Sequence, residues 1–549
     1  MTRQRYAVLG VAALVGLAGC KDLKEEVVTG VTGEYFETAA GADAAITGAY
    51  NRLRNFYGQE REVAMTQLGT DSWEKGGEIA ADGAWNDYTA VLGPTFAGSG
   101  NNNHLLNWWS NSYEAINATN TAIAAIEPST TIPEATKTLR LGEARFLRAL
   151  FYFNLVRQFG DVHLTLEPTA GVVTEATRTP AAEIYTQAII PDLEFALTAL
   201  PVTQANFGRA TVGAAKMLLA EVLLTRAATG DFARARTLTS EVIASGTYRL
   251  KPNYESIFCG PFRTGAACDF VPANETDAEF IWSVQFTGDE SQDQFGNSLH
   301  LYYTMAYDLA SAVSPTLART LEYGRPFRRL RPTLHLLNLF DRTNDSRYLA
   351  TFQTLWQRPN GDTAIYFPGT NVATKPAGAQ GNWWGQNNYS PILFPTVKKW
   401  LDQTRANPAT FAGKRDRHLW RIADAYLLRA EANIRDGNVA AAIPDINVLR
   451  RRAALPGRET ANELSAAELT ALNANAIDFL LDERERELAA EEFRFWTLTR
   501  MGRLVDRVRR FNPGGAPNVQ PHHALRPIPQ TQIDRTEGGA GAFPQNPGY

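Results

Sequence analysis

Cysteine and histidine are scarce in this sequence. The 549 residues include three cysteines and seven histidines, and the histidines are dispersed, with His522-His523 as the only adjacent pair. A zinc site needs three or four such ligands close together. The sequence therefore predicts no metal site, and we expect no cofactor.

An excess of positive charge is also missing. The formal net charge is -4, the sequence pI is about 6.1, and the lysines and arginines are scattered. A nucleic-acid-binding surface usually appears as a cluster of basic residues. The sequence also has no nucleophile elbow and no phosphate-cradling glycine loop. We therefore expect no nucleic-acid partner and no catalytic residues.

The chain has one apolar run near its start, and it is short. Residues 7–18 are apolar and follow Arg3 and Arg5, a pattern typical of a secretory signal that is too short to be a stable membrane span. Leu17-Ala18-Gly19 directly precedes Cys20, which resembles a bacterial lipobox. That resemblance implies a signal peptide at 1–19 and lipidation of Cys20, which would tether the protein to a membrane. Plain cleavage beside an incidental cysteine is the alternative.

The other two cysteines are Cys259 and Cys268. In an exported protein they could pair across a short loop that contains glycine. Two free thiols are the other interpretation, and the sequence leaves both open.

What the sequence does contain is helical periodicity. Residues 421–455 read as two helices joined at Gly437, and 216–250 repeat the pattern around Gly230. Small residues permit close helix packing, and glycine supplies the left-handed backbone that ends a helix. These are hairpins of the tetratricopeptide type. The pattern predicts a mainly α protein.

The rest of the chain is organised around these hairpins. We expect helices at 38–54, 107–126, 139–159 and 182–200, with 139–159 buried at the centre, and a long helical stretch at 476–508. Between 251 and 414 the periodicity fades, and proline, glycine, asparagine and aromatic residues become frequent. We expect a helical scaffold at about 38–250 and 415–510, a loop-rich insertion at 251–414 and an extended tail at 511–549.

Several motifs in order resemble one family. They are the lipobox at Cys20, WSNSYEAINATN from Trp109, GEARFLRALFYFNLVRQFGDVHL from Gly142, EIYTQAIIPDLEFALTALP from Glu183, FDRTNDSRY from Phe340, KKWLD from Lys398, RIADAYLLRAEA from Arg421, LLDERERELAAEEFRFWTLTR from Leu480, and LRPIPQTQID with QNPGY at the end. The set resembles the SusD/RagB outer-membrane lipoproteins and spans essentially the whole mature chain.

This resemblance implies one SusD-like domain over 20–549. Family members sit on the cell surface over a TonB-dependent (SusC-like) outer-membrane transporter, capture oligosaccharides or in some cases peptides, and hand them inward. The resemblance thus implies a binding protein and not an enzyme. Peptide binding, and a scaffold that only bridges proteins, remain the alternatives.

Sugars present apolar C–H faces and a rim of hydroxyls, so a glycan site needs aromatic platforms with polar groups around them. Two segments offer this combination, and any of their rings could instead plug a loop onto the scaffold. The candidate binding residues are Asp71, Trp73, Trp85 and Tyr88 in the first segment, and Asn382, Trp383 and Trp384 in the second.

A run of carboxylates from Asp482 to Glu492 suggests a glycosidase, because paired carboxylates cleave glycosidic bonds. Arg484, Arg486 and Arg494 are interleaved with these acids at helical spacing. That spacing predicts ion pairs that join helices and keep the acids ionised. We interpret the run as structural, and we read Trp109, Tyr113 and Trp496 as core residues on helices.

Overall fold

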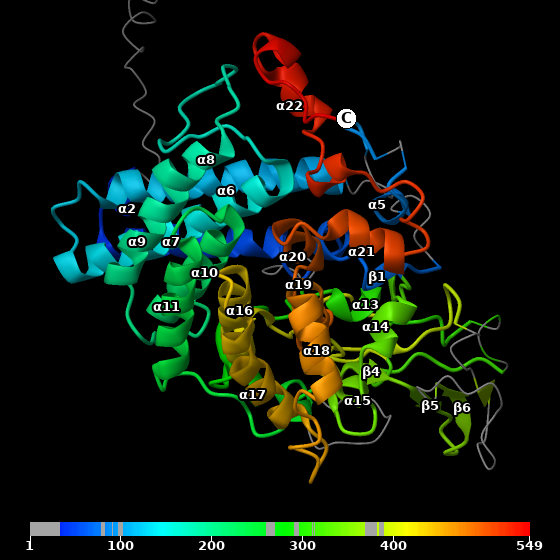
Figure 1. Cartoon of the computed structure of the whole chain (residues 1–549). Coiled ribbons are helices and arrows are strands. Elements are labelled where there is room, and N and C mark those ends of the chain that lie inside the picture. The colour runs from blue at the N-terminus through cyan, green and yellow to red at the C-terminus, as the bar shows by residue number, and fades with distance from the viewer. Residues whose placement is uncertain are drawn as a thin grey trace, which may run out of the picture.

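The computed structural model describes residues 33–77, 83–89, 92–96, 103–259, 270–289, 296–309, 311, 313, 315–367, 382–383 and 389–549. The mainly α prediction is confirmed (Figure 1). The elements before the insertion are α2 (Gly33–Phe36), α3 (Ala39–Asn51), η1 (Arg52–Asn55), α4 (Glu60–Thr66), β1 (Trp73–Lys75), α5 (Gly83–Asp87), α6 (His104–Ile126), α7 (Glu134–Phe159), α8 (Ala181–Ile184), η2 (Tyr185–Ile189), α9 (Ile190–Ala199), α10 (Val212–Arg226) and α11 (Asp231–Ala244).

Helix α7 lies at the centre of this half. From Leu141 to Phe159 every residue except Arg145 is buried. Helices α3, α6 and α9 pack against it, and α9 leads on to α10. This burial confirms the predicted central helix. A helix that is apolar nearly all round must be covered on every side.

The two predicted hairpins are α10 with α11, and α16 (Ile422–Arg435) with η6 (Val439–Ala442) and α17 (Ile443–Ala453). They lie side by side, because α11 packs against α16 (Figure 1). Arg236 forms an ion pair with Asp436 at 2.7 Å, and Arg435 Nη1 donates to the carbonyl of Leu224 at 2.7 Å. The second hairpin therefore continues the helical array after the insertion.

The insertion is short helices, short strands and loops, as predicted. Its elements are η3 (Glu255–Ile257), η4 (Pro272–Thr276), β2 (Phe280–Val284), α13 (Leu299–Tyr302), β3 (Leu330–Pro332), α14 (Leu334–Asn338), α15 (Arg347–Thr351), β4 (Phe352–Gln353), β5 (Leu355–Gln357), β6 (Thr363–Tyr366), β7 (Asn382–Trp383) and β8 (Thr396–Val397). Strand β2 pairs antiparallel with β9 (Arg417–Arg421), directly before α16. A three-stranded sheet has the order β5-β6-β7, with β6 and β7 parallel.

The long helical stretch predicted at 476–508 is three helices, because left-handed residues Ala490 (φ 64°) and Gly502 (φ 64°) interrupt it. The tail predicted as extended contains three short helical segments, and its Ile528 and Phe543 are fully buried in the main core. The elements here are α18 (Ala466–Ala474), α19 (Ala476–Leu488), α20 (Arg494–Arg500), α21 (Leu504–Phe511), η7 (Pro521–Ala524), α22 (Gln530–Arg535) and η8 (Gly539–Gly541).

Cys259 is disulfide-bonded. Cys20 and Cys268 lie outside the described residues. The pairing of Cys259 with Cys268 and the lipidation of Cys20 therefore stay predictions.

The turn of the second hairpin gives a stability prediction. Gly437 has φ 83°, and a Cβ atom there would meet nothing within 4 Å, so only backbone strain opposes a side chain. We expect Gly437→Ala to lower the free energy of unfolding by about 1–2 kcal/mol, the cost of a left-handed non-glycine residue. Denaturant unfolding measures this. The control is Gly541→Ala, which also points into open space but is not left-handed; an equal loss in both variants would contradict the explanation.

Candidate functional site

The first predicted aromatic segment is part of the core. Trp73 and Trp85 are 0% exposed. Trp73 packs edge-on against Tyr303 at 4.9 Å between ring centroids, and Trp85 packs edge-on against Phe96 at 5.4 Å. A fully buried ring has no free face for a sugar. The prediction that these rings form a binding platform is therefore corrected, and they plug the loop onto the scaffold.

The two other candidates in this segment are buried as well. Tyr88 is 2% exposed, and its hydroxyl donates to the carbonyl of Gly69 at 2.7 Å. Asp71 is fully buried and accepts from Nε and Nη2 of Arg494, each at 2.8 Å, and from Arg507. Burial alone would raise the pKa of Asp71, but the two guanidinium groups outweigh it and hold the pKa well below its usual range. Both side chains are structural.

The carboxylate run on α19 is an ion-pair network, as predicted. Glu483 accepts from Arg347 at 2.9 Å and from Arg450 at 2.7 Å, and Glu487 accepts from Arg421 at 2.7 Å. Burial opposes ionisation of both acids, yet the neighbouring arginines lower both pKa values. Because arginines already occupy these oxygens, the pair offers no free acid and base for glycoside hydrolysis.

Glu485 is the exception in this network. It is 0% exposed, and its one ion pair within the described part of the chain is with Arg494 at 3.3 Å. Burial, with Glu492 and Asp71 nearby, raises its pKa to about 8. The expectation that every acid here stays ionised is wrong for Glu485, because the arginine already serves two other carboxylates.

Among the predicted core residues, Trp109 and Trp496 are 2% and 1% exposed, which confirms their role. Tyr113 is only half-buried, and its hydroxyl donates to the carbonyl of His163 at 3.0 Å.

No helix in the described ranges is long and apolar enough to cross a membrane.

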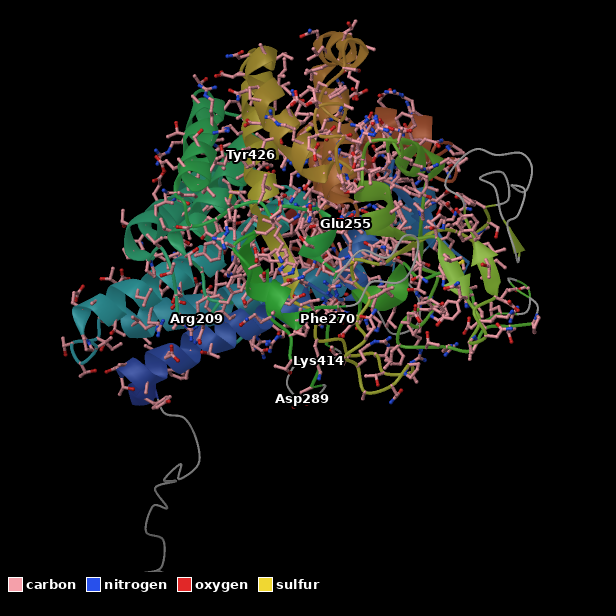
Figure 2. The ribbon with its side chains drawn as sticks, turned by 90° about the horizontal axis from the view of Figure 1, so that it is seen from below. Arg209, Glu255, Phe270, Asp289, Lys414 and Tyr426 are labelled. Carbon is pink, nitrogen blue, oxygen red and sulfur yellow. The ribbon has the colours of Figure 1, made fainter. Side chains whose placement is uncertain are left out.

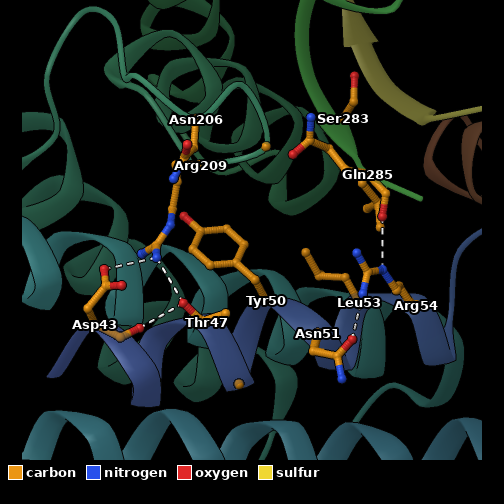
Figure 3. A pocket seen from close by; sticks show the side chains of 13 residues that line it. Asp43, Thr47, Tyr50, Asn51, Leu53, Arg54, Asn206, Arg209, Ser283 and Gln285 are labelled. Atoms are coloured by element: carbon orange, nitrogen blue, oxygen red, sulfur yellow. Dashed lines mark hydrogen bonds and ion pairs between the residues drawn. The ribbon is translucent and has the colours of Figure 1, made fainter. Parts of the chain in front are cut away.

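A polar groove of about 670 Å³ opens beside α3 (Figure 3). Three segments that are distant in sequence form it: α3 with η1, the loop before α10, and the end of β2. Its volume falls within the range of small-molecule sites in proteins. The lining residues are Asp43, Thr47, Gly48, Tyr50, Asn51, Leu53, Arg54, Asn206, Gly208, Arg209, Ser283, Val284 and Gln285.

Arg209 forms one wall of this groove. Its Nη2 donates to Asp43 at 3.0 Å and to Thr47 Oγ1 at 2.9 Å (Figure 3). Its Nη1 donates to Glu143 at 3.2 Å. Glu143 is fully buried on α7 and also accepts from the hydroxyl of Tyr50 at 3.2 Å. Burial, reinforced by Glu143, raises the pKa of Tyr50 well above its usual range. The wall is thus fixed before any ligand arrives.

Arg54 forms the opposite end. Its Nε donates to the carbonyl of Gln285 at 2.8 Å, and its Nη1 donates to Asn51 Oδ1 at 2.9 Å. These bonds join η1 to the end of β2. Hydroxyl and amide groups around one ring suit the recognition of sugar hydroxyls.

The sequence pattern did not reveal this groove, because no two of its three segments are neighbours in the chain. The one local signal is Gly48 inside a helical pattern, since such a glycine weakens the helix without an evident gain.

Comparison with known proteins identifies the family. The SusD family model matches residues 278–549, and a second model, described as "Starch-binding associating with outer membrane", matches residues 37–224. The chain belongs to the SusD/RagB family. It is 26% identical to SusD-like protein P2 of Formosa agariphila, over 100% of both chains. It is also 26% identical to starch-binding protein SusD of Bacteroides thetaiotaomicron, over 74% of this chain and 72% of that protein.

A solved laminarin-binding SusD-like protein has the same fold. Its TM-score is 0.67 at 22% identity, covering 93% of this chain and 99% of that chain. The described association of the family with the outer membrane agrees with the lipobox-like start of the sequence.

In this SusD-family chain the second predicted aromatic segment lies on β7. Asn382 and Trp383 form this strand, in which Asn382 pairs with Ile365 and Trp383 with Tyr366 of β6. Strand β7 is the edge of the sheet, and Tyr366 is half-buried. Trp384 and the side chains of 382–383 lie outside the described residues. Their role in binding stays a prediction.

Removal of a buried counterion gives a second stability prediction. We expect Asp71→Asn to lower the free energy of unfolding by about 3–5 kcal/mol, because Arg494 and Arg507 keep their buried charge and lose a partner. The control is Glu114→Gln in the exposed pair with Arg52, which should change stability by less than about 1 kcal/mol. Urea unfolding compares them, and equal effects would refute a dominant role for burial.

Glu485 gives a prediction about pH. In the unfolded chain this acid ionises near 4.5, whereas in the folded protein its pKa is about 8. Between these values only the folded state holds the proton, so a rise in pH favours unfolding. Glu485→Gln should therefore gain stability over the unmodified protein as pH rises from 4.5 to 8. Unfolding at a series of pH values tests this; exposed Glu175→Gln should show no such trend, and a flat difference for Glu485→Gln would contradict the assignment.

Proposed function

We propose that this protein is a surface-exposed lipoprotein of the outer membrane that binds oligosaccharides or polysaccharide fragments and delivers them to a partner TonB-dependent (SusC-like) transporter. The observation that carries the proposal is the family match over both halves of the chain, 37–224 and 278–549, one half of which is described as starch-binding. Relatives named for starch and laminarin binding support a glycan ligand. Cys20 would carry the lipid.

The protein performs no chemistry on its ligand in this proposal. The acidic run on α19 is the place where a glycosidase pair would be sought. Glu483 and Glu487 are fully buried there, and each is bonded to more than one arginine. Such acids cannot reach a glycosidic bond in solvent. Capture and release are therefore the proposed activity.

We propose Asn382, Trp383 and Trp384 as part of the glycan platform. Two findings support this choice. The first aromatic segment is excluded as a glycan platform, because Asp71, Trp73, Trp85 and Tyr88 are buried. Asn382 and Trp383 of the remaining segment lie on an edge strand, and the strand pairs Trp383 with the half-buried aromatic residue Tyr366. Neighbouring aromatic residues at a sheet edge suit the apolar faces of sugar rings.

Binding of a glycan panel tests the proposal. Residues 21–549 are titrated calorimetrically with oligosaccharides from starch, laminarin, xylan and mannan, and with mixed peptides. We expect saturable heat from at least one glycan class. The double variant Trp383→Ala/Trp384→Ala should weaken that binding by about tenfold or more, because each aromatic ring that stacks on a sugar ring contributes on the order of 1 kcal/mol.

The control is Phe411→Ala, an aromatic side chain that is 38% exposed elsewhere in the insertion. It should bind as the unmodified protein does. Saturation by peptides alone, or hydrolysis of any glycan, would refute the proposal.

A further inference from the structure

The groove beside α3 contains two glycines, and packing explains only one of them. A Cβ atom at Gly208 would lie 2.6 Å from Gln285 Oε1, so glycine lets the loop before α10 approach the end of β2. A Cβ atom at Gly48 would meet nothing within 4 Å. Glycine is less favourable than alanine inside a helix, and no neighbour of Gly48 requires it. The absence of a side chain at Gly48 leaves this part of the groove open, so that a ligand can approach the helix backbone closely.

The polar groups of the groove are of two kinds. Arg209 and Thr47 are held by bonds within the protein, so they form a rigid wall. Asn206 is exposed and its side-chain amide has no hydrogen-bond partner in the described ranges; Asn51 accepts one bond and its amide N–H groups donate none there. Because the wall is already rigid and carries free amides on both sides, a ligand that binds there would lose little free energy to the ordering of protein side chains.

The charge of the wall indicates the kind of ligand. Arg209 is compensated by Asp43 and by Glu143. Arg54 is already bonded to the carbonyl of Gln285 and to Asn51. An anion would therefore gain little from Arg209. Amide groups both donate and accept hydrogen bonds, which matches a neutral hydroxyl that does the same.

We propose that this groove is a second ligand site, which binds a short neutral segment of a polyhydroxylated chain, such as a few sugar units of a glycan. Half-buried Tyr50 lines this groove together with Asn51 and Asn206, whose exposed amide groups would bond the sugar hydroxyls (Figure 3). The inference does not depend on the platform proposed on β7.

The two sites are far apart on the molecule. Figure 2 shows Arg209 near the blue helix α3, on the opposite side from strands β5 and β6, and Figure 1 likewise separates α2 and α9 from β5 and β6. A long chain that reaches both sites would gain avidity, whereas a short fragment occupies one at a time. Separate variants can therefore remove each site.

The experiment starts from Trp383→Ala/Trp384→Ala in residues 21–549, which removes the proposed platform. Calorimetric titration with neutral starch, laminarin, xylan and mannan fragments should show residual saturable binding. A polygalacturonate fragment, which is anionic, should bind no more tightly than the neutral fragments. Adding Gly48→Leu should weaken this residual binding at least tenfold, and adding Asn206→Ala should weaken it severalfold. Gly541→Leu, another glycine with open space around it, should leave it unchanged.

A separate readout distinguishes ligand contact from damage to the fold. Gly48→Ala should raise the midpoint of thermal unfolding by about 1 °C, because alanine favours the helix, and should still weaken binding. No residual binding without the platform, tighter binding of polygalacturonate, or equal affinity in Gly48→Leu and Gly541→Leu would each overturn the inference. In the first and last cases binding that depends on Trp383 and Trp384 would leave the proposed function standing.

Discussion

Buried arginines hold this protein together, since the helical scaffold and the loop-rich insertion meet at charged side chains. Arg347 from the insertion donates to Glu483 on α19, and Arg421 at the end of β9 donates to Glu487 and Glu491. Each charge carries a large desolvation cost, which is offset only while its partners stay in place. The network therefore fixes one arrangement of the insertion on the scaffold, and a shifted register would leave charges unpaired.

This constraint explains why an irregular insertion can be well placed. The insertion has few regular hydrogen-bonded strands, and its own small core gathers around Trp356 and Tyr307. Charged contacts at Arg347 and the β2–β9 pairing tie it to the scaffold. Loops on a rigid scaffold are where binding surfaces commonly form. The groove beside α3 includes residues at the end of β2, which belongs to this insertion.

Much of the architecture was predictable because helices can be recognised from short-range patterns in the sequence. The α7 core helix, the hairpins at Gly230 and Gly437 and the fading periodicity of the insertion all follow from short-range patterns. The acidic run on α19 was also correctly interpreted, because arginines at helical spacing point to ion pairs. The exception was Glu485, whose raised pKa depends on Arg494 serving two other acids, Asp71 and Glu492.

The sequence by itself determined the family, the helical hairpins and the structural nature of the acidic run, because each depends on neighbours along the chain. Only the tertiary structure decided which aromatic residues are available to a ligand. Trp73 and Trp85 stand among glycines and polar residues, as surface rings often do, yet both are fully buried. Burial is set by segments hundreds of residues away, such as Tyr303 and Arg526, and no local pattern contains that information.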